Sequence, residues 1–176
     1  MATVVKSKNA HLEARKQQAL QAAVDAAEKA ALGIAGYPPA LTPVTVAQFL
    51  LESDWGRAGM GEANNYFGIK ARDGEPFVVR TTREVINGKT VTTEARFRKY
   101  DSMADCFADH ARLICERRRR DGRRIYDAAL QHPDDPVAFA RALTGVYATD
   151  PHYGDKLVAI MSDRGLLETF GFETRV

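Results

Sequence analysis

An apolar segment that ends in a carboxylate constrains the fold of this 176-residue chain more than any other feature. Thr42 offers an N-cap and Pro43 suits the first helical position, so the mostly apolar residues 44–51 predict a buried helix that ends at Glu52. Burial disfavours an ionised carboxylate and raises its pKa. A carboxyl group that stays protonated near neutral pH can act as a general acid, and Glu52 is the first candidate for this role.

The residues after Glu52 predict a tight exit from the helix. Trp55, the only tryptophan of the chain, precedes Gly56, and this exit is expected to bring the indole to the Glu52 carboxyl. The alternative is that Glu52 caps the helix or forms a salt bridge with its head group in solvent. The neighbouring indole favours the interpretation as an acid in a binding site.

Composition predicts one globular domain with a core of its own, since 45% of the residues are hydrophobic and 27% are charged. No stretch approaches the roughly 20 apolar residues of a membrane span. Residues 1–10 contain two lysines but no hydrophobic region, so no secretory signal is visible and synthesis in the cytoplasm is expected. We expect a flexible leader over residues 1–10, a single domain over 11–170, a tail over 171–176, and a monomer.

Hydrophobic patterning elsewhere predicts an α+β fold that is mainly α. Helices are expected over residues 11–32, 102–117, 125–130, 136–145 and 153–163. Asp150 is a plausible N-cap of the last helix, with Pro151 at its first position.

A small antiparallel lobe is expected between these helices. Residues 77–83, 84–86 and 90–100 are rich in β-branched and aromatic side chains, and Asn87-Gly88 is a strong hairpin signal. We therefore predict two or three strands. A groove between this lobe and the helices is the natural place for an elongated ligand.

Hydrolysis of a glycosidic bond usually requires an acid and a second group opposite the sugar ring. Glu52 is the candidate acid. The expected lobe carries Glu84 and Glu94, and Glu84 is preferred as the second carboxylate because it lies just before the turn, at the mobile tip of the lobe. For either residue the alternative is a charge on an edge strand.

Two polar and aromatic segments suit a sugar site. Residues 64–70 combine amides, which suit hydroxyl or acetamido groups, with aromatic faces, which suit pyranose rings. The alternative is a loop closed by aromatic packing, and it is preferred for Phe67 and Ile69. Residues 147–153 form a second segment of this kind, which by itself indicates only a helix start.

The net charge is only +2, but six arginines lie within residues 117–124. This run predicts an anion-binding surface, or alternatively a solvated helix end and turn around Asp121 and Gly122. No nucleic-acid partner is expected, since no helix-turn-helix, zinc or stacking signature accompanies the arginines. The four histidines lack metal-ligand spacing and no nucleotide fingerprint is present, so we expect neither a metal ion nor a cofactor.

Four ordered motifs, in residues 47–56, 65–70, 97–102 and 147–156, resemble the glucosaminidase family of glycoside hydrolases, family seventy-three, which includes the peptidoglycan-hydrolase domain of flagellar rod proteins. The resemblance covers about residues 22–167. It implies a lysozyme-like, mainly α fold with a β-lobe. It also implies cleavage of the β-1,4 bond between N-acetylglucosamine and N-acetylmuramic acid in peptidoglycan glycan strands.

Carried over residue by residue, the resemblance implies that Glu52 is the catalytic acid, Glu84 the second glutamate and Tyr147 the active-site tyrosine. The chain departs from the family at Asp54, where glycine is usual, and in the longer, more basic run at 117–124. If Asp54 lies close to Glu52, it would disfavour ionisation of Glu52. The expected substrate-binding residues are Trp55, Asn65, Tyr66, Phe67, Gly68, Lys70, Thr149, Asp150 and Tyr153.

The resemblance leaves several readings open. Our hypothesis is an inverting or acetamido-assisted route, with Glu84 on a mobile lobe that closes over the glycan. The alternatives are a muramidase or a lytic transglycosylase on the same scaffold, or a wall-binding or assembly module without catalysis. A chain made in the cytoplasm would reach the wall after lysis, injection or non-classical export.

Overall fold

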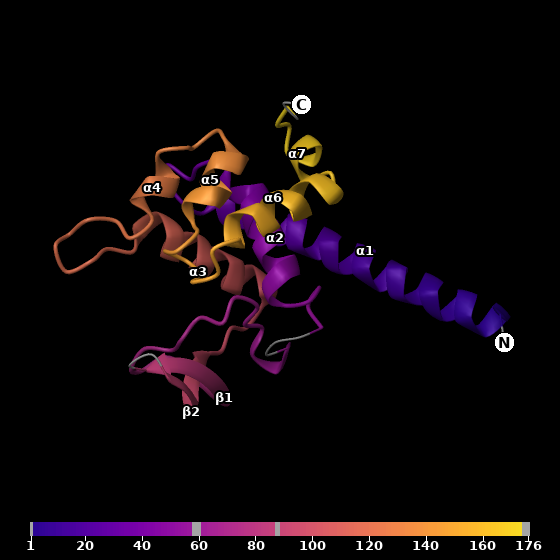
Figure 1. Cartoon of the computed structure of the whole chain (residues 1–176), viewed down its shortest axis with the longest axis horizontal. Coiled ribbons are helices and arrows are strands. Elements are labelled where there is room, and N and C mark those ends of the chain that lie inside the picture. Colours follow the sequence, from indigo (N-terminus) through magenta and orange to yellow (C-terminus); the bar gives the residue numbers. More distant parts are fainter. Residues whose placement is uncertain (1, 58–60, 87–88, 174–176) are drawn as a thin grey trace.

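The computed structural model describes residues 2–57, 61–86 and 89–173, without the side chains of residues 2–8, 83–86, 89 and 90. Within these ranges the fold is mainly α with one antiparallel hairpin, as predicted (Figure 1). The elements are α1 (Ala2–Leu32), α2 (Leu41–Glu52), η1 (Gly61–Ala63), β1 (Phe77–Ile86), β2 (Lys89–Arg98), α3 (Met103–Glu116), α4 (Asp127–Leu130), α5 (Pro136–Ala142), α6 (Tyr153–Asp163) and α7 (Leu166–Thr169).

Helix α2 is the buried centre of the molecule, and it packs against α1, α5 and α6. Ten of its twelve residues are buried, which confirms the predicted buried helix. The predicted cap is wrong, because Thr42 lies inside the helix and Ala40 precedes it without a side-chain hydrogen bond. The preceding Pro38 and Pro39 carbonyls already accept hydrogen bonds from the first helical amides, so the helix begins earlier than the Thr42-Pro43 signal suggests.

Helix α1 corrects the expected leader, because the chain is helical from Ala2 onward. No glycine or proline interrupts the sequence before Gly33, so nothing ends the helix at residue 10. Among the described side chains of α1, those that are buried lie in its C-terminal part, where small alanines such as Ala23 and Ala27 allow close packing against α2 and α3. The N-terminal part extends away from the body (Figure 1).

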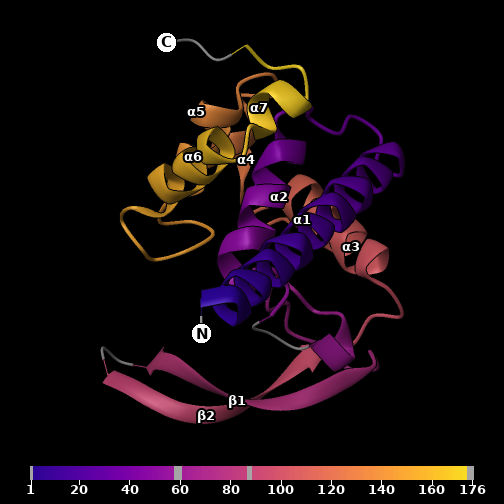
Figure 2. The same cartoon turned by 90° about the vertical axis from the view of Figure 1, so that its right-hand side faces the viewer.

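Strands β1 and β2 pair antiparallel from Phe77 opposite Arg98 to Ile86 opposite Lys89. One continuous strand therefore spans the two segments expected over residues 77–83 and 84–86. The predicted Asn87-Gly88 turn lies outside the described residues, although the register on either side is that of a two-residue connection. The hairpin lies beneath the helical body (Figure 2).

Charged side chains join the hairpin to the body. Arg80 of β1 pairs with Glu62 of η1. Arg98, the last residue of β2, contacts both Glu75 at 3.0 Å and Asp109 of α3 at 3.1 Å. No helix in the described ranges is both long and apolar enough to cross a membrane.

Helix α6 has the predicted bounds, but Asp150 is not its N-cap. His152 holds that position, because Pro151 and His152 form a turn before the helix begins. The Asp150 carboxylate instead accepts from the His152 amide at 2.9 Å and from Lys156 at 2.5 Å. These contacts lower the pKa of Asp150, with the Lys156 hydrogen bond as the largest cause.

Candidate active site

A cavity of about 720 Å³ contains the carboxyl group of Glu52. Its lining comes from five separate parts of the chain: the end of α2, the loop before β1, the end of β2, one face of α3 with the segment that follows, and the loop between α5 and α6. The lining includes Glu52, Phe67, Gly68, Lys70, Arg98, Asp109, Arg112, Leu113, Glu116, Arg117, Tyr126 and Tyr147.

Glu52 is the last residue of α2 and opens to the cavity. Its Oε1 atom accepts a hydrogen bond of 2.9 Å from the Tyr153 hydroxyl. The Tyr153 oxygen in turn accepts a bond of 3.0 Å from Nε2 of Gln48, one helical turn before Glu52. Glu52 as a whole residue is exposed, but the protein around its carboxyl still buries that group in part. This partial burial raises the pKa of Glu52, and the hydrogen bond from Tyr153 lowers it by less. The carboxyl is thus biased toward its protonated form.

The hydrogen-bond chain also selects one carboxyl oxygen. Because Gln48 donates to the Tyr153 oxygen, the hydroxyl hydrogen of Tyr153 is directed to Oε1 of Glu52. An oxygen that accepts this bond is the poorer place for the acidic proton. The proton of Glu52 therefore belongs on Oε2, the oxygen that Tyr153 does not occupy.

The turn after Glu52 is tight, as predicted. Asp54, Trp55 and Gly56 all have positive φ, at 46°, 61° and 73°. Ser53 secures the turn, because its Oγ donates to the Phe49 carbonyl at 2.6 Å and accepts from the Gly56 amide at 2.8 Å.

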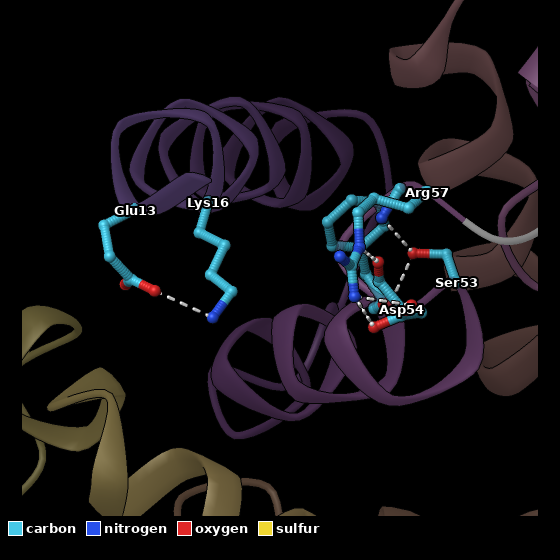
Figure 3. Close-up of polar contacts among 7 residues, drawn as sticks. Glu13, Lys16, Ser53, Asp54 and Arg57 are labelled. Atoms are coloured by element: carbon cyan, nitrogen blue, oxygen red, sulfur yellow. Dashed lines mark hydrogen bonds and ion pairs between the residues drawn. The ribbon is translucent and has the colours of Figure 1, made fainter. Parts of the chain in front are cut away.

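The neighbouring acid, Asp54, is occupied elsewhere. Both of its carboxylate oxygens accept from Nη2 of Arg57, at 2.9 and 2.8 Å (Figure 3). The causes of the Glu52 pKa shift are burial and the Tyr153 hydrogen bond, without a contribution from Asp54. The expected influence of Asp54 on Glu52 is therefore not found.

Trp55 does not line the Glu52 cavity, so the expected approach of the indole to the acid is not found, and a contact of Trp55 with substrate stays a prediction. The indole lies between Lys16 of α1, at 5.6 Å, and Arg164 after α6, at 4.8 Å. Lys16 also pairs with Glu13 along α1 (Figure 3). The run of left-handed residues after Ser53 turns the tryptophan toward α1 instead of the cavity.

Tyr147 lines the cavity from the loop between α5 and α6, and its role as the active-site tyrosine stays a prediction. Its ring stacks on Tyr153, with centroids 5.6 Å apart and planes at 17°. Burial raises the pKa of Tyr147 well above its usual value, and the nearby Glu52 charge adds to this rise. The hydroxyl therefore remains a neutral hydrogen-bond donor across the physiological range.

The loop at residues 64–70 divides into structural and cavity-lining members. The side-chain amide of Asn65 is used within the protein. Its Nδ2 donates to the carbonyls of Ile69 in the loop and Arg98 in β2, and its Oδ1 accepts from the Ile69 amide. Tyr66 packs edge-on against Phe49 at 5.4 Å. Neither Asn65 nor Tyr66 lines the cavity, in contrast to the prediction that they bind substrate.

Phe67, Gly68 and Lys70 do line the cavity. The Phe67 ring also stacks on the His110 ring, with centroids 4.0 Å apart, so Phe67 has the packing role that was preferred for it. His110 is fully buried, and neither ring nitrogen has a hydrogen-bond partner among the described residues. Burial lowers the pKa of His110 to about 3, so the ring is neutral and supports Phe67 from within the core.

The segment at residues 147–153 contributes less to the cavity than expected. Thr149 is exposed and Asp150 is paired with Lys156, and neither lines the cavity. Tyr153 is only 3% exposed, and its hydroxyl is occupied by Glu52 and Gln48. Tyr153 is therefore placed to position the acid, and the predicted contact with substrate is not supported.

Glu84 lies on β1 opposite Val91, and its side chain is outside the described part of the structure. Glu94 lies on β2 opposite Thr81. The role of Glu84 as second carboxylate therefore stays a prediction. No group of three or more histidine, cysteine or acidic residues in the described ranges could hold a metal ion.

Sequence reasoning missed one wall of the cavity. Asp109, Arg112, Leu113 and Glu116 recur every three or four residues, which places them on one face of α3. That period was visible in the sequence beside the apolar face of the same helix. The arginine run continues from this wall as an exposed loop, closed by a bridge between Arg118 and Arg124, that projects from the body (Figure 1).

Comparison with known proteins identifies the family to which this chain belongs. The chain is 38% identical over 129 residues to the exo-glucosaminidase LytG of Bacillus subtilis, which covers 73% of the chain and 45% of that protein. It is 38% identical over 125 residues to a probable N-acetylmuramidase of Lactococcus lactis, covering 70% of the chain and 28% of the relative. The chain thus spans less than half the length of these curated relatives.

A solved structure agrees with the fold. The catalytic domain of the autolysin Auto from Listeria monocytogenes superimposes with a TM-score of 0.73 at 27% identity, over 93% of this chain and 95% of that one. The model of the glucosaminidase family, described as mannosyl-glycoprotein endo-beta-N-acetylglucosaminidase, matches residues 18–166. This match takes in every residue that lines the cavity, and the chain belongs to the glucosaminidase family.

Proposed function

We propose that this chain is a peptidoglycan hydrolase, an endo-β-N-acetylglucosaminidase that cleaves the β-1,4 bond from N-acetylglucosamine to N-acetylmuramic acid. The observation that carries the proposal is the Glu52 carboxyl, which opens to a large cavity while burial raises its pKa and Tyr153 holds one of its oxygens. Family membership and the relative named as a glucosaminidase support the choice of bond. The site of action is the cell wall, outside the cytoplasmic membrane.

In this mechanism Glu52 is the general acid. Its proton passes from Oε2 to the glycosidic oxygen as the bond to the anomeric carbon breaks. Water then adds its hydroxyl to that carbon, and the remaining proton of the water goes to the ionised Glu52 or to the second carboxylate. The substrate acetamido group or a second carboxylate assists from the opposite side of the ring. Tyr147, a neutral donor in the same cavity, is placed to bind a sugar oxygen or the acetamido carbonyl near the reacting centre.

The register of the hairpin supports Glu84 over Glu94 as the second carboxylate. Residues directly opposite in an antiparallel pair share a face, and faces alternate along each strand. Glu84 therefore shares a face with Arg80, which pairs with Glu62 in the body, and with the buried Phe97. Glu94 lies on the other face of the hairpin. Arg80 and Phe97 turn this face to the body near the base of the hairpin, which supports Glu84 over Glu94.

This assignment predicts unequal effects of two matched substitutions. Glu84→Gln should lower kcat on peptidoglycan by about a hundredfold, the scale of an acid or base contribution, whereas Glu94→Gln should stay within about twofold of wild type. Initial rates of fragment release at saturating substrate would measure both. Near wild-type turnover by Glu84→Gln would remove the residue from the mechanism, and a loss confined to Glu94→Gln would transfer the role.

A muramidase is the second candidate, because one similar protein is named a probable N-acetylmuramidase. The two activities break alternate bonds of the same strand, so the ends of the products distinguish them. Purified peptidoglycan would be digested, reduced with borohydride and analysed by mass spectrometry. Reduced N-acetylglucosamine ends support the proposal. Reduced N-acetylmuramic acid ends would make the protein a muramidase, anhydro ends a lytic transglycosylase, and an absence of fragments a binding module.

A further inference from the structure

The cavity wall formed by α3 and the residue after it carries two arginines whose charges are not used inside the protein. Arg112 lies on α3, and Arg117 is the C-cap residue that follows the helix. Within the described part of the chain, neither guanidinium group forms a hydrogen bond or an ion pair. Glu116 lines the same wall but does not pair with Arg112.

Two other charged residues of the cavity lining, Asp109 and Arg98, are engaged within the protein. Asp109 accepts from Arg98 at 3.1 Å and from the Tyr100 hydroxyl at 2.6 Å. Arg98 also contacts Glu75. Unlike Arg98, Arg112 and Arg117 therefore leave their guanidinium donors available to a ligand in the cavity. Guanidinium groups present planar pairs of donors that match a carboxylate.

The cavity is continuous between the acid and these arginines. The Tyr153 ring, beside Glu52, stacks on Tyr147, and the Tyr147 centroid lies 6.1 Å from that of Tyr126. The positive charge of Arg117 is close enough to Tyr126 to offset part of the rise that burial causes in its pKa. Two cavity-lining rings, Tyr147 near Glu52 and Tyr126 near Arg117, therefore form a row along the cavity.

We propose that Arg112 and Arg117 form a carboxylate subsite that binds the stem peptide of the muramyl residue beside the cleaved bond. This inference rests on the proposed function. Only the muramyl residues of a glycan strand carry stem peptides with free carboxylates, and N-acetylglucosamine has no charged group. A cationic subsite at one end of the row of rings would therefore fix the register of the strand, and so determine which of the two alternating bonds reaches Glu52.

The test uses soluble, uncross-linked peptidoglycan strands, free of other anionic wall polymers, before and after conversion of their carboxylates to amides. Wild-type protein should lose about tenfold in kcat/KM on the amidated strands, the scale of one charge-assisted hydrogen bond. The double variant Arg112→Gln/Arg117→Gln should cleave both substrates at the same reduced rate. Arg120→Gln, on the exposed loop and outside the cavity lining, is the matched control and should keep the wild-type preference.

Equal rates of wild-type protein on both substrates would overturn the subsite. A loss in the double variant that is the same on native and amidated strands, with the wild-type preference retained, would also overturn it. Strands treated with an amidase keep a lactyl carboxylate but lose the peptide. A wild-type rate on these strands as high as on native ones would contradict recognition of the stem.

Binding separates failure of the subsite from failure of the proposed function. The Glu52→Gln protein, with and without the two arginine substitutions, would be titrated with native and amidated strands. A preference for native strands of about tenfold that depends on the arginines supports the subsite even if wild-type protein cleaves a different bond or none. Equal affinity for both kinds of strand would overturn the subsite, whatever the outcome of the end analysis.

Discussion

At the scale of single residues, the pKa of Glu52 is set by two opposing neighbours. Burial raises it, and the hydrogen bond from Tyr153 lowers it by less. A general acid acts only when protonated, so activity should fall as pH rises through the pKa of Glu52. The same hydrogen bond holds the carboxyl in place, so Tyr153 is a positioning residue with two separable effects.

Tyr153→Phe removes a donor that stabilises the ionised carboxylate. The pKa of Glu52 should therefore rise, and the alkaline limb of the kcat against pH profile should move to higher pH. The plateau of kcat should fall roughly tenfold, because the carboxyl loses its orientation. Tyr37→Phe, which removes a tyrosine hydroxyl bonded to Thr42 away from the cavity, is the control and should leave the profile in place. If the alkaline limb of the Tyr153→Phe profile stayed at the wild-type pH or moved to lower pH, this account would be contradicted.

Glu52 should also cost the protein stability. Because its folded pKa lies above the ordinary value of 4.5, stability is lost as pH rises from that value through the folded pKa. Glu52→Gln removes this loss. Its Tm should match wild type below pH 4 and exceed it by roughly 1–3 °C at pH 7, a small gain since the side chain is partly solvated. Scanning calorimetry at both pH values measures it. A lower Tm at pH 7 would show that the carboxylate is favourable there.

At the scale of elements, helices α2, α3 and α6 and the hairpin could be predicted, because each follows a strong local period or turn signal. The path of the chain after Glu52 could not be predicted from the sequence. Three successive left-handed residues place Trp55 against α1, and only one of them is the glycine that marks such a conformation in a sequence. Tyr153 was found, but its role was not, because that role depends on Gln48 of a distant helix.

Gly154 permits the close contact of α5 and α6 that places Tyr153. A Cβ atom at this position would lie 2.5 Å from Cα of Arg141 and 2.8 Å from the Ala140 carbonyl oxygen, both backbone atoms. Gly154→Ala should therefore lower the free energy of unfolding by roughly 1–3 kcal/mol, measured in urea, and reduce kcat through Tyr153. Gly61→Ala, where nothing lies within 4 Å of the added atom, is the matched control. Equal stability of the two variants would contradict the tight approach.

At the scale of the whole molecule, the cavity is assembled from segments that are far apart in sequence. Ordered motifs indicated Glu52, Tyr147 and the loop at 67–70, because each carries a recognisable local pattern. The wall from α3 follows a helical period in the sequence, but its charged side chains resemble a solvated face, and only the packing of the hairpin and the loop before it encloses them. Their place in the site follows from tertiary packing around Arg98, which joins β2 to α3.

The central claim is that Glu52 is the acid of a glycoside hydrolase, and the most direct test compares two neighbouring acids. Glu52→Gln and Asp54→Asn each remove one negative charge from the same turn, but only Glu52 opens to the cavity. Release of soluble fragments from purified peptidoglycan should fall at least about a thousandfold for Glu52→Gln and stay within about twofold for Asp54→Asn. Substantial cleavage by a folded Glu52→Gln protein would contradict the account.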